Sequence, residues 1–570
     1  MKKSATVLTG VSLVVLLFGS LAEGQVSPQS LEIIRSRLHQ AKIFFDKMPE
    51  TRRQVLSGAA QNLIHLANVS EHGRLGEIFN RPAPLRKASA GTSAPGGVIA
   101  VSDPSNDFAF SLQTGFTQSE TSTAWCGSHV TVGFNDSGSI PESIFSGPGG
   151  VSGSGVALST DFGHHFQDLG FVNPGSNPAN ILAGDPVLGC ADAGTFHYAQ
   201  LFETADSMGN PLTDIAVSTS SDGGATWADP VAAVSKDGFT HFLDKDWMAV
   251  DPSNANRLFV TYTDFDFSGI VCPGAERVAI ELVSSTDGGT TWSAPVVVDE
   301  VCSVPPSFPF VQGSQVALGP SGEVYVAWEF FSDFFTRELH IRKSTDHGVS
   351  FTPFVKIDNV TCVGDCETVQ GLFRTFLDLG SLVVDRSGTA TNGNVYVVWH
   401  DGRNLNVPSF TISGFYGYAD VLLRRSTDGG ATWQAPVRVN NNREPLHSGR
   451  GTDQYQPGLA VDNTGGIGAC WYDRRLDPLN YQIDRFCGVS TDAGATWTNT
   501  RQSSPSWSPI HATDFEIDTL YMGDYDGLTS DFTKSTPGFI GAFQMMNTRG
   551  GLAGNSILVP NPDVFATGFK

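Results

Sequence analysis

The chain has 570 residues, of which 16% are charged and 40% are hydrophobic, so it can form several domains or one large repeat array. Its 62 glycines and 31 prolines favour many short strands joined by turns. The formal net charge of -23 argues against nucleic acid as a partner, because so acidic a surface repels phosphate backbones.

The first 24 residues have the three parts of a secretory signal peptide. Lys2 and Lys3 precede a mostly apolar run at 7–18, and small residues follow at 20–22. This run is too short to span a bilayer, and no later run of about 20 apolar residues occurs. We therefore expect residues 1–24 to be a bacterial-type signal peptide. The mature protein is expected to be secreted or periplasmic, without a transmembrane segment.

Residues 25–81 differ from the rest of the chain. Apolar residues recur at near-helical spacing from Leu31 to Phe44 and from Val55 to Leu66, with Pro49 between the two runs. This pattern predicts a helical N-terminal extension with two helices. Residues 82–96, rich in Pro, Ala, Gly and Ser, are expected to form a linker. The spacing does not decide whether the helices dimerise, cap the following domain or cover a pocket in it.

One eight-residue pattern, Ser-x-Asp-x-Gly-x-x-aromatic, occurs six times in the remaining chain. The copies begin at Ser159, Ser220, Ser285, Ser344, Ser426 and Ser490. In each octet the Asp can accept backbone hydrogen bonds, the Gly supplies a conformation that other residues resist, and the aromatic ring fills space below. The octets therefore predict a tight turn that recurs once in each four-stranded blade of a β-propeller.

Apolar strands precede each octet, as at Val395–Trp399, and their continuous apolar character fits strands that are buried on both faces. A seventh pair of strands is predicted at Leu520–Asp524 and Phe539–Gln544. Two N-terminal stretches, Gly97–Val101 and Phe108–Leu112, can supply its outer strands. We expect residues 97–570 to form an all-β propeller, with seven blades closed by N- and C-terminal strands. A six-bladed ring is the alternative.

Eight cysteines in an exported chain favour disulfides over metal ligation. The pairs favoured by proximity are Cys126–Cys190, Cys272–Cys302, Cys362–Cys366 and Cys470–Cys487. Other connectivities stay open at this point.

The octet resembles the Asp box, or BNR repeat, of sialidase-like propellers, and the six copies cover roughly residues 117 to 500. The resemblance implies a glycan-directed protein whose site lies near the axis, on the face opposite to the octets. In sialidases a Tyr nucleophile helped by a carboxylate, an Asp acid/base and three arginines perform the hydrolysis. The Asp residues of the octets are therefore expected to be structural.

Strand ends on that opposite face supply the candidate site. The catalytic candidates are Asp401, Tyr472, Asp473 and Tyr521, and the substrate-binding candidates are Arg374, Arg403, Arg450, Arg474, Arg475 and Asp246. Arginines can hold a sugar carboxylate through paired hydrogen bonds. The sequence lacks the Arg-Ile-Pro motif of sialidases between residues 25 and 158, so an arginine triad would have to be assembled from the arginines named above.

The same residues also have a structural interpretation. Asp401–Arg403 and Asp473–Arg475 can be salt bridges within the scaffold, and Tyr521 can be a packed rim tyrosine. The functional alternatives are thus an exo-acting glycoside hydrolase on acidic or other glycans, a non-catalytic propeller that binds glycans or proteins at the cell surface, and an adhesion module with a flat rim.

No cofactor is expected, although residues 264–269 resemble the first half of a calcium loop. The twelfth position of that loop would be Ala275, which excludes an EF-hand and leaves only a looser calcium site on the rim.

Overall fold

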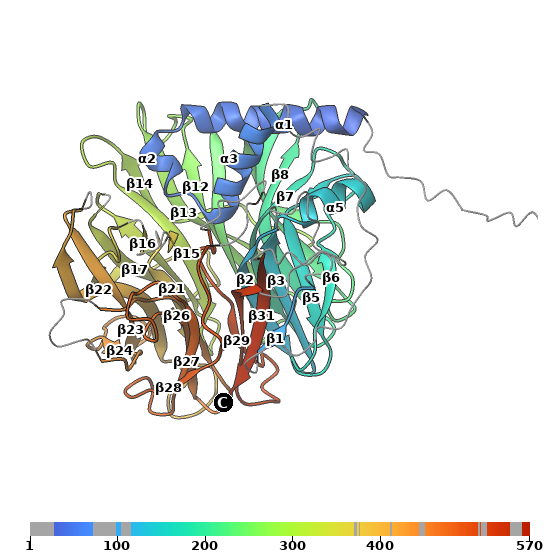
Figure 1. Ribbon diagram of the computed structural model, residues 1–570. Helices are drawn as coiled ribbons and strands as arrows, with labels where there is room; N and C mark the ends of the chain where they lie inside the picture. Colours follow the sequence, from blue (N-terminus) through green and yellow to red (C-terminus); the bar gives the residue numbers. More distant parts are fainter. Residues whose placement is uncertain are drawn as a thin grey trace, which may run out of the picture.

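Seven sheets, each containing four antiparallel strands and one of them a fifth, parallel strand, surround a central axis in the computed structural model (Figure 1). The structure describes residues 28–71, 98–103, 116–333, 335–366, 368–369, 373–374, 377–410, 413–443, 451–510, 514, 521–547 and 561–570. The fold is thus an all-β propeller of seven blades, and the six-bladed alternative is excluded.

The first four blades follow one another along the chain. Blade 1 contains β2 (Gln118–Cys126), β3 (His129–Asp136), β5 (Ser154–Ser159) and β6 (Gln167–Phe171). Blade 2 contains β7 (Ile181–Cys190), β8 (Phe196–Ala205), β9 (Pro211–Ser220) and β10 (Val231–Asp237), and the short β4 (Val151–Ser152) pairs with β7 in parallel. Blade 3 contains β11 (His241–Val250), β12 (Leu258–Asp266), β13 (Glu276–Ser285) and β14 (Val296–Ser303). Blade 4 contains β15 (Phe310–Leu318), β16 (Val324–Phe331), β17 (Arg337–Ser344) and β18 (Val355–Val360).

The remaining blades complete the ring. Blade 5 contains β21 (Leu379–Val384), β22 (Val395–Pro408), β23 (Phe415–Ser426) and β24 (Val437–Arg438), and a separate pair, β19 (Thr368–Val369) and β20 (Phe373–Arg374), precedes it. Blade 6 contains β25 (Gln454–Val461), β26 (Ile467–Asp473), β27 (Asp484–Ser490) and β28 (Thr498–Arg501). Blade 7 contains β29 (Leu528–Ser530), β30 (Phe539–Asn547), β31 (Asn561–Phe569) and β1 (Ile99–Ala100).

Blade 7 joins the two ends of the propeller, as predicted. Its outermost strand is β1, which pairs with β31 through Ile99 and Ala566. The predicted strand at Phe539–Gln544 lies within β30. The prediction of an innermost strand at Leu520–Asp524 is wrong for residues 521–524, because the innermost strand is β29. The stretch Phe108–Leu112 lies outside the described residues.

Each octet forms the turn between the third and fourth strands of a blade. In the second octet Asp222 Oδ1 accepts from Thr226 N at 2.9 Å and Asp222 Oδ2 from Thr226 Oγ1 at 2.7 Å, which lowers the pKa of Asp222 to about 2. Gly224 donates its N–H to Ser220 Oγ at 2.9 Å and has a φ of 93°, which favours glycine. The carboxylate is therefore engaged in holding the turn.

Between the blades, the apolar runs of the second strands pack face to face. Trp328 on β16, Trp399 on β22 and Trp471 on β26 occupy matching places in consecutive blades and are fully buried. Burial on both faces explains why these strands are continuously apolar instead of alternating. Four disulfides with the expected pairing reinforce the ring: Cys126–Cys190, Cys272–Cys302, Cys362–Cys366 and Cys470–Cys487.

Helices lie across one end of the propeller (Figure 1). They are α1 (Pro28–Lys47), the short α2 (Glu50–Arg53) and α3 (Gly58–Glu71), while α5 (Ser139–Ser146) follows β3. Phe44 and Phe45 pack against Phe242 of β11 with ring centroids 6.2 and 5.0 Å apart. The extension thus caps the ring through an apolar interface. No helix among the described residues is long and apolar enough to cross a membrane.

Candidate functional site

A β-bulge recurs on the innermost strand of the blades. In blades 1 to 6 the register between the first and second strands shifts at this place. In four blades a side chain stands there on a backbone with positive φ: Glu120 (50°), Asp185 (58°), Lys245 (51°) and Gln456 (54°). Such conformations are strained for residues other than glycine, and strain of this kind is concentrated at functional sites. The bulges therefore make the axis, which the innermost strands surround, the candidate location of a functional site.

At the axis, Glu120 of blade 1 meets Tyr521, which precedes blade 7. The Tyr521 hydroxyl donates a hydrogen bond to Glu120 Oε1, and Asp524 N donates to the same oxygen at 2.9 Å. Asn135 Nδ2 donates to Glu120 Oε2 at 2.7 Å, while Asn135 Oδ1 accepts from Asp185 N at 2.9 Å. Glu120 is fully buried, and both of its oxygens are held in place by donors. A tyrosine and a glutamate are thus paired and oriented at the centre of the ring.

Further carboxyl groups surround this pair. We call Glu120, Asp185, Asp244, Asp246 and Asp524 the axial carboxyl cluster. Burial, reinforced by the charge of Asp185, raises the pKa of Glu120 to about 8, and burial raises the pKa of Asp185 to about 6 against the lowering effect of Lys245. Groups with such shifted pKa values can exchange protons near neutral pH.

Lys245 is the cation of the cluster, and it lies beside the aromatic ring of Tyr525. Its Nζ is 3.3 Å from the Tyr525 ring centroid, and the Tyr525 hydroxyl donates to Pro186 O at 3.0 Å. The positive charge lowers the pKa of both Glu120 and Asp185. Lys245 thus offsets part of the repulsion among the buried carboxyl groups.

The sequence-predicted residues Tyr521 and Asp246 both lie at the axis. Asp246 is fully buried, and neither of its carboxyl oxygens has a hydrogen bond to another residue among those described. Burial raises the pKa of Asp246 well above its usual value. Tyr472, in contrast, lies between blades 6 and 7, where its hydroxyl donates to Gln544 O at 3.1 Å and accepts from Gln544 N at 3.0 Å.

The predicted acids Asp401 and Asp473 lie in matching places on β22 and β26. Asp401 Oδ2 accepts from Trp399 Nε1 at 2.9 Å and from Arg403 at 2.5 Å. Asp473 Oδ2 accepts from the corresponding Trp471 Nε1 at 2.7 Å and from Arg475 Nε at 2.8 Å. The Trp-x-Asp-x-Arg pattern therefore gives the same local contact in both blades, and the structure does not bring these acids into the axial carboxyl cluster.

The predicted arginines are dispersed. Arg403 also pairs with Asp358 at 3.2 Å, and Arg475 NH1 donates to Asn441 at 2.7 Å. Arg474 is fully buried and donates from NH1 to Asn480 O at 3.0 Å. Arg374 belongs to β20, and Arg450 lies outside the described residues.

Sequence reasoning missed two other buried arginines, Arg337 and Arg485. Arg337 pairs with Asp378 at 2.5 Å, and Arg485 pairs with Asp526 at 2.9 Å. Each is a charged residue inside a strand that is otherwise largely buried, which is the signal that could have identified it. Both guanidinium groups are thus engaged by carboxylates of the scaffold.

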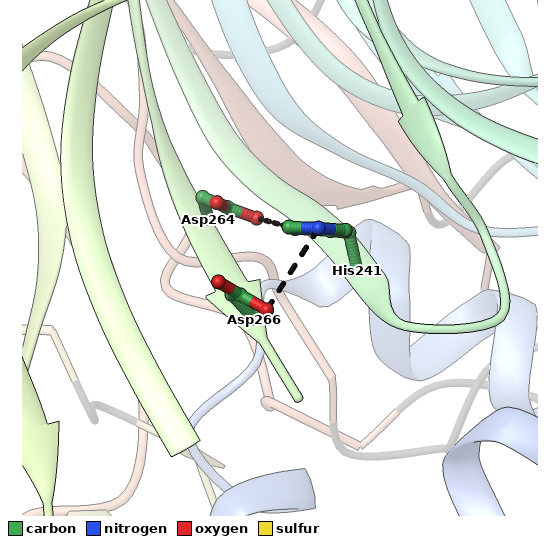
Figure 2. A group of neighbouring side chains, drawn as sticks. All are labelled: His241, Asp264 and Asp266. Atoms are coloured by element: carbon green, nitrogen blue, oxygen red, sulfur yellow. Dashed lines mark hydrogen bonds and ion pairs between the residues drawn. The ribbon is translucent and has the colours of Figure 1, made fainter. Parts of the chain in front are cut away.

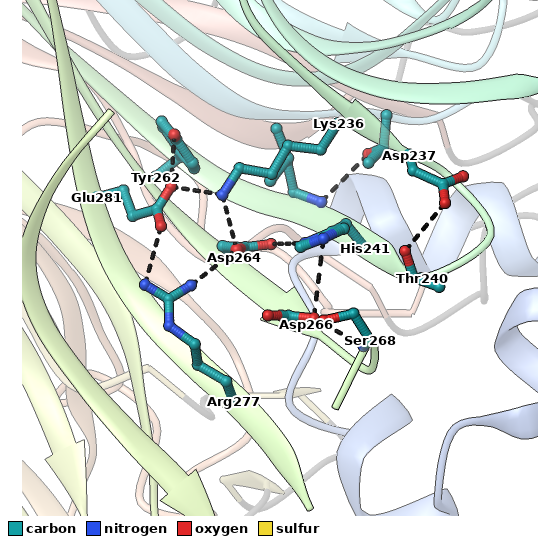
Figure 3. Close-up of polar contacts among 12 residues, drawn as sticks. Lys236, Asp237, Thr240, His241, Tyr262, Asp264, Asp266, Ser268, Arg277 and Glu281 are labelled. Carbon is teal, nitrogen blue, oxygen red and sulfur yellow. Dashed lines mark hydrogen bonds and ion pairs between the residues drawn. The ribbon is translucent and has the colours of Figure 1, made fainter. Parts of the chain in front are cut away.

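A second polar network lies in blade 3 (Figures 2 and 3). His241 stands between two carboxylates, with Nδ1 2.9 Å from Asp264 and Nε2 3.8 Å from Asp266. Asp264 Oδ2 also accepts from Lys236 Nζ at 2.7 Å and from Arg277 NH1 at 3.1 Å. Asp264 is therefore already surrounded by two cations, Lys236 and Arg277, and by a histidine that can become one. These residues do not fit a calcium ion, because the ion would be repelled by the neighbouring positive charges.

A central cavity lies along the axis beside the cluster, and the extension closes the axis at the other end. A cavity of about 270 Å³ runs along the innermost strands from Thr121 and Asp526 to Asp531 and Lys534. On the opposite side, the N-terminal turn of α3 fills the axis, since Ser57 N donates to Asp244 Oδ2 at 2.8 Å. The N-terminal extension thus covers the candidate site.

No protein-family model matches the chain, and no curated protein matches it. Among solved structures, it is similar to a Hadza microbial sialidase (17% identity, TM-score 0.39, 69% of this chain and 66% of that one). It is also similar to the α-L-arabinanase of Penicillium chrysogenum (14%, 0.40, 68% and 94%) and to an ulvan lyase of polysaccharide lyase family 25 (10%, 0.46, 84% and 96%). The chain thus spans just under two thirds of the sialidase. Likenesses at this level do not identify a function, which has to be argued from the site.

Proposed function

We propose that the protein is an exported glycoside hydrolase that removes sugars from the ends of glycans at the axial carboxyl cluster. The observation that carries this proposal is the hydrogen bond from the Tyr521 hydroxyl to Glu120 within a buried group of carboxyls. A phenol is a weak nucleophile unless a neighbouring base accepts its proton, and Glu120 is placed to do so. The depth of the cluster favours a chain end over the middle of a polymer.

In the proposed reaction, the Tyr521 oxygen attacks the anomeric carbon while its proton passes to Glu120. The bond from the anomeric carbon to the leaving oxygen breaks, and Asp185 supplies the proton that this oxygen takes up. A water molecule then releases the sugar from Tyr521, with Asp185 as base and Glu120 returning the proton to the phenolate. The reaction needs Glu120 as the carboxylate and Asp185 as the acid; with pKa values of about 8 and about 6, a minor fraction of the molecules has this combination near neutral pH.

Hydrolysis of fluorogenic glycosides tests this proposal. The assay compares the Gly58→Leu variant with Gly58→Leu/Tyr521→Phe. A Cβ atom at position 58 would overlap Tyr521, and we expect the covering helix to move away as a result. We expect turnover by the first protein and its loss in the second, while Tyr472→Phe in the Gly58→Leu background retains turnover. Equal rates with and without the Tyr521 hydroxyl would refute the mechanism.

A non-catalytic glycan-binding propeller is the second candidate. The observation in its favour is that Arg337, Arg403, Arg475 and Arg485 all pair with aspartates, so they contribute to the scaffold. A binder would retain sugar affinity after Tyr521→Phe and lose it after changes to the carboxyls that face the ligand. Equilibrium binding of a glycan to the Gly58→Leu protein, measured beside its turnover, therefore separates the candidates, because only the binder binds without hydrolysis.

A further inference from the structure

We propose that residues 55–60 are an intramolecular competitor for the sugar-binding subsite, and that the groups they present there identify the ligand class as uncharged sugars or amino sugars. This inference rests on the function proposed for the axial carboxyl cluster. It adds a regulatory role for the N-terminal extension and a chemical preference for the site.

The first observation is how the start of α3 meets the cluster. Ser57 N donates to Asp244 Oδ2 at 2.8 Å, and Gly58 N donates to Asp524 Oδ2 at 3.1 Å. Ser57 also caps the helix, since its Oγ accepts from Ala60 N at 3.2 Å. The positive end of a 14-residue helix thus points at two carboxylates, which is a favourable electrostatic arrangement.

The second observation is the close approach at Gly58. A Cβ atom added to this glycine would overlap both the Tyr521 hydroxyl and Glu120 Oε1. The backbone of the extension therefore stands in contact with the two groups to which we assign nucleophile and base. A sugar ring that presents its anomeric carbon to Tyr521 needs this same space.

Further contacts anchor the extension besides those of Ser57 and Gly58. Arg52 donates to Glu276 at 2.9 Å and to Ser303 Oγ at 2.7 Å, and its guanidinium lies 4.5 Å from the Phe310 ring centroid. Gln312 Nε2 contacts Asp244 Oδ2 at 2.8 Å and Val55 O at 3.4 Å. These contacts hold the extension in place over the cluster, so a ligand that enters from this face has to displace residues 55–60.

The chemistry of the contact indicates the ligand. The groups that the extension offers to Asp244 and Asp524 are hydrogen-bond donors, and the described residues of the cluster include five carboxyls and the cation Lys245. Sugar hydroxyls or an ammonium group can replace these N–H donors one for one. A carboxylate on the sugar would instead face buried acids at a high electrostatic cost. Uncharged sugars and amino sugars are therefore favoured over sialic acids.

The test uses the full chain and two routes to opening. Gly58→Leu displaces the helix by overlap, and Arg52→Ala removes an anchor without changing the cluster. Ser36→Leu, on the exposed face of α1, is the matched control for added hydrocarbon. Hydrogen exchange of residues 48–71 reports displacement, and initial rates on fluorogenic β-N-acetylglucosaminide, glucosaminide and α-sialoside report access.

We expect faster exchange and a rate increase of about tenfold or more in both opening variants, because the rate follows the fraction of molecules with an accessible site. The control should match the parent protein, and the sialoside should be the poorest substrate. Faster exchange without any gain in turnover or in sugar binding would overturn the inference. Unchanged exchange in both Gly58→Leu and Arg52→Ala would also overturn it, since neither the overlap nor the loss of an anchor would then displace the extension. A sialoside preferred over both other substrates would overturn the ligand class.

The two proposals fail in different ways. If the opening variants bind the methyl glycosides of glucosamine or N-acetylglucosamine more tightly than the parent but hydrolyse nothing, hydrolysis is refuted and the competitor role stands. If the parent and both variants hydrolyse at one rate through Tyr521, hydrolysis stands and the competitor role is refuted.

Discussion

Gly58 of the N-terminal extension lies against Tyr521, and Tyr521 donates its hydroxyl hydrogen to Glu120. These contacts join three parts of the chain that are far apart in sequence, since Glu120 and Tyr521 are 401 residues apart. Ring closure therefore assembles the candidate site, and the extension covers it. The consequences can be tested separately.

Removing the proposed base should abolish turnover without unfolding the protein. In the Gly58→Leu background, Glu120→Gln keeps the size of the side chain but can no longer accept the Tyr521 proton. We expect the rate to fall by about 10²-fold or more, the size typical of a lost general base. The measurement is the initial rate on the best fluorogenic glycoside, with circular dichroism as the control for folding. A variant that keeps the parental rate would remove Glu120 from the mechanism.

Glu120 should also make stability depend on pH. Its ordinary pKa of 4.5 is raised to about 8 in the folded protein, so the folded state binds more protons than the unfolded state between these values. This stabilising contribution is fully present below pH 4.5 and is lost as the pH rises through 8. Each unit of such a shift corresponds to about 1.4 kcal/mol.

Glu120→Gln should therefore flatten the fall in the free energy of unfolding between pH 5 and 8. Urea unfolding at several pH values measures this slope in the parent and the variant. Glu329 has a similarly raised pKa of about 8, caused first by burial, so Glu329→Gln is the matched comparison outside the cluster. Parallel curves for the parent and Glu120→Gln would contradict the assignment.

Asp401→Asn and Asp473→Asn should reduce stability and leave turnover per folded molecule unchanged. Each change removes the charge that pairs with Arg403 or Arg475 and weakens the bond from Trp399 or Trp471. The arginines keep other partners and some solvent contact, so we expect a loss of about 1–3 kcal/mol in the free energy of unfolding. Loss of turnover with stability intact would favour a catalytic role for these acids.

Calcium should not stabilise the network in blade 3. Asp264 already accepts from His241, Lys236 and Arg277, so an added ion would have to displace these donors. We expect the melting temperature to be the same in calcium and in chelator. Asp264→Asn should lower it, because Lys236 and Arg277 would then lack a carboxylate between them. A calcium-dependent rise that disappears in Asp264→Asn would show that a site exists there.

The sequence predicted the ring because its signals are local. The octets form turns within eight residues. The second strands are continuously apolar, and this composition alone indicates that they are buried on both faces. The predicted position of the innermost strand of blade 7, Leu520–Asp524, was wrong for residues 521–524 because the backbone there makes other hydrogen bonds. Gly523 has a φ of 88°. Asp524 N donates to the Glu120 side chain and Gly527 N donates to Thr121 Oγ1, so these backbone groups bond to side chains instead of to the backbone of a neighbouring strand.

The residues of the axial carboxyl cluster were harder to predict, because they do not belong to one sequence motif. Tyr521 and Asp246 were chosen as candidates from their place in the repeat, and both lie at the axis. Glu120, Asp185 and Lys245 belong to bulges that only the paired strands define. A run such as Asp244-Lys245-Asp246 inside a buried strand was the available signal, because charged residues are rarely buried in succession. The position of the extension over the site could not be derived from helical spacing alone.

The most direct measurement is mass spectrometry of the Gly58→Leu protein after incubation with an activated fluorosugar that forms slowly hydrolysed covalent intermediates. The account predicts one sugar per chain, attached to Tyr521, and no adduct in Gly58→Leu/Tyr521→Phe. The parent protein should react much more slowly, since Gly58 and its neighbours occupy the site. An adduct on another residue, or equal labelling of the parent and Gly58→Leu, would contradict it.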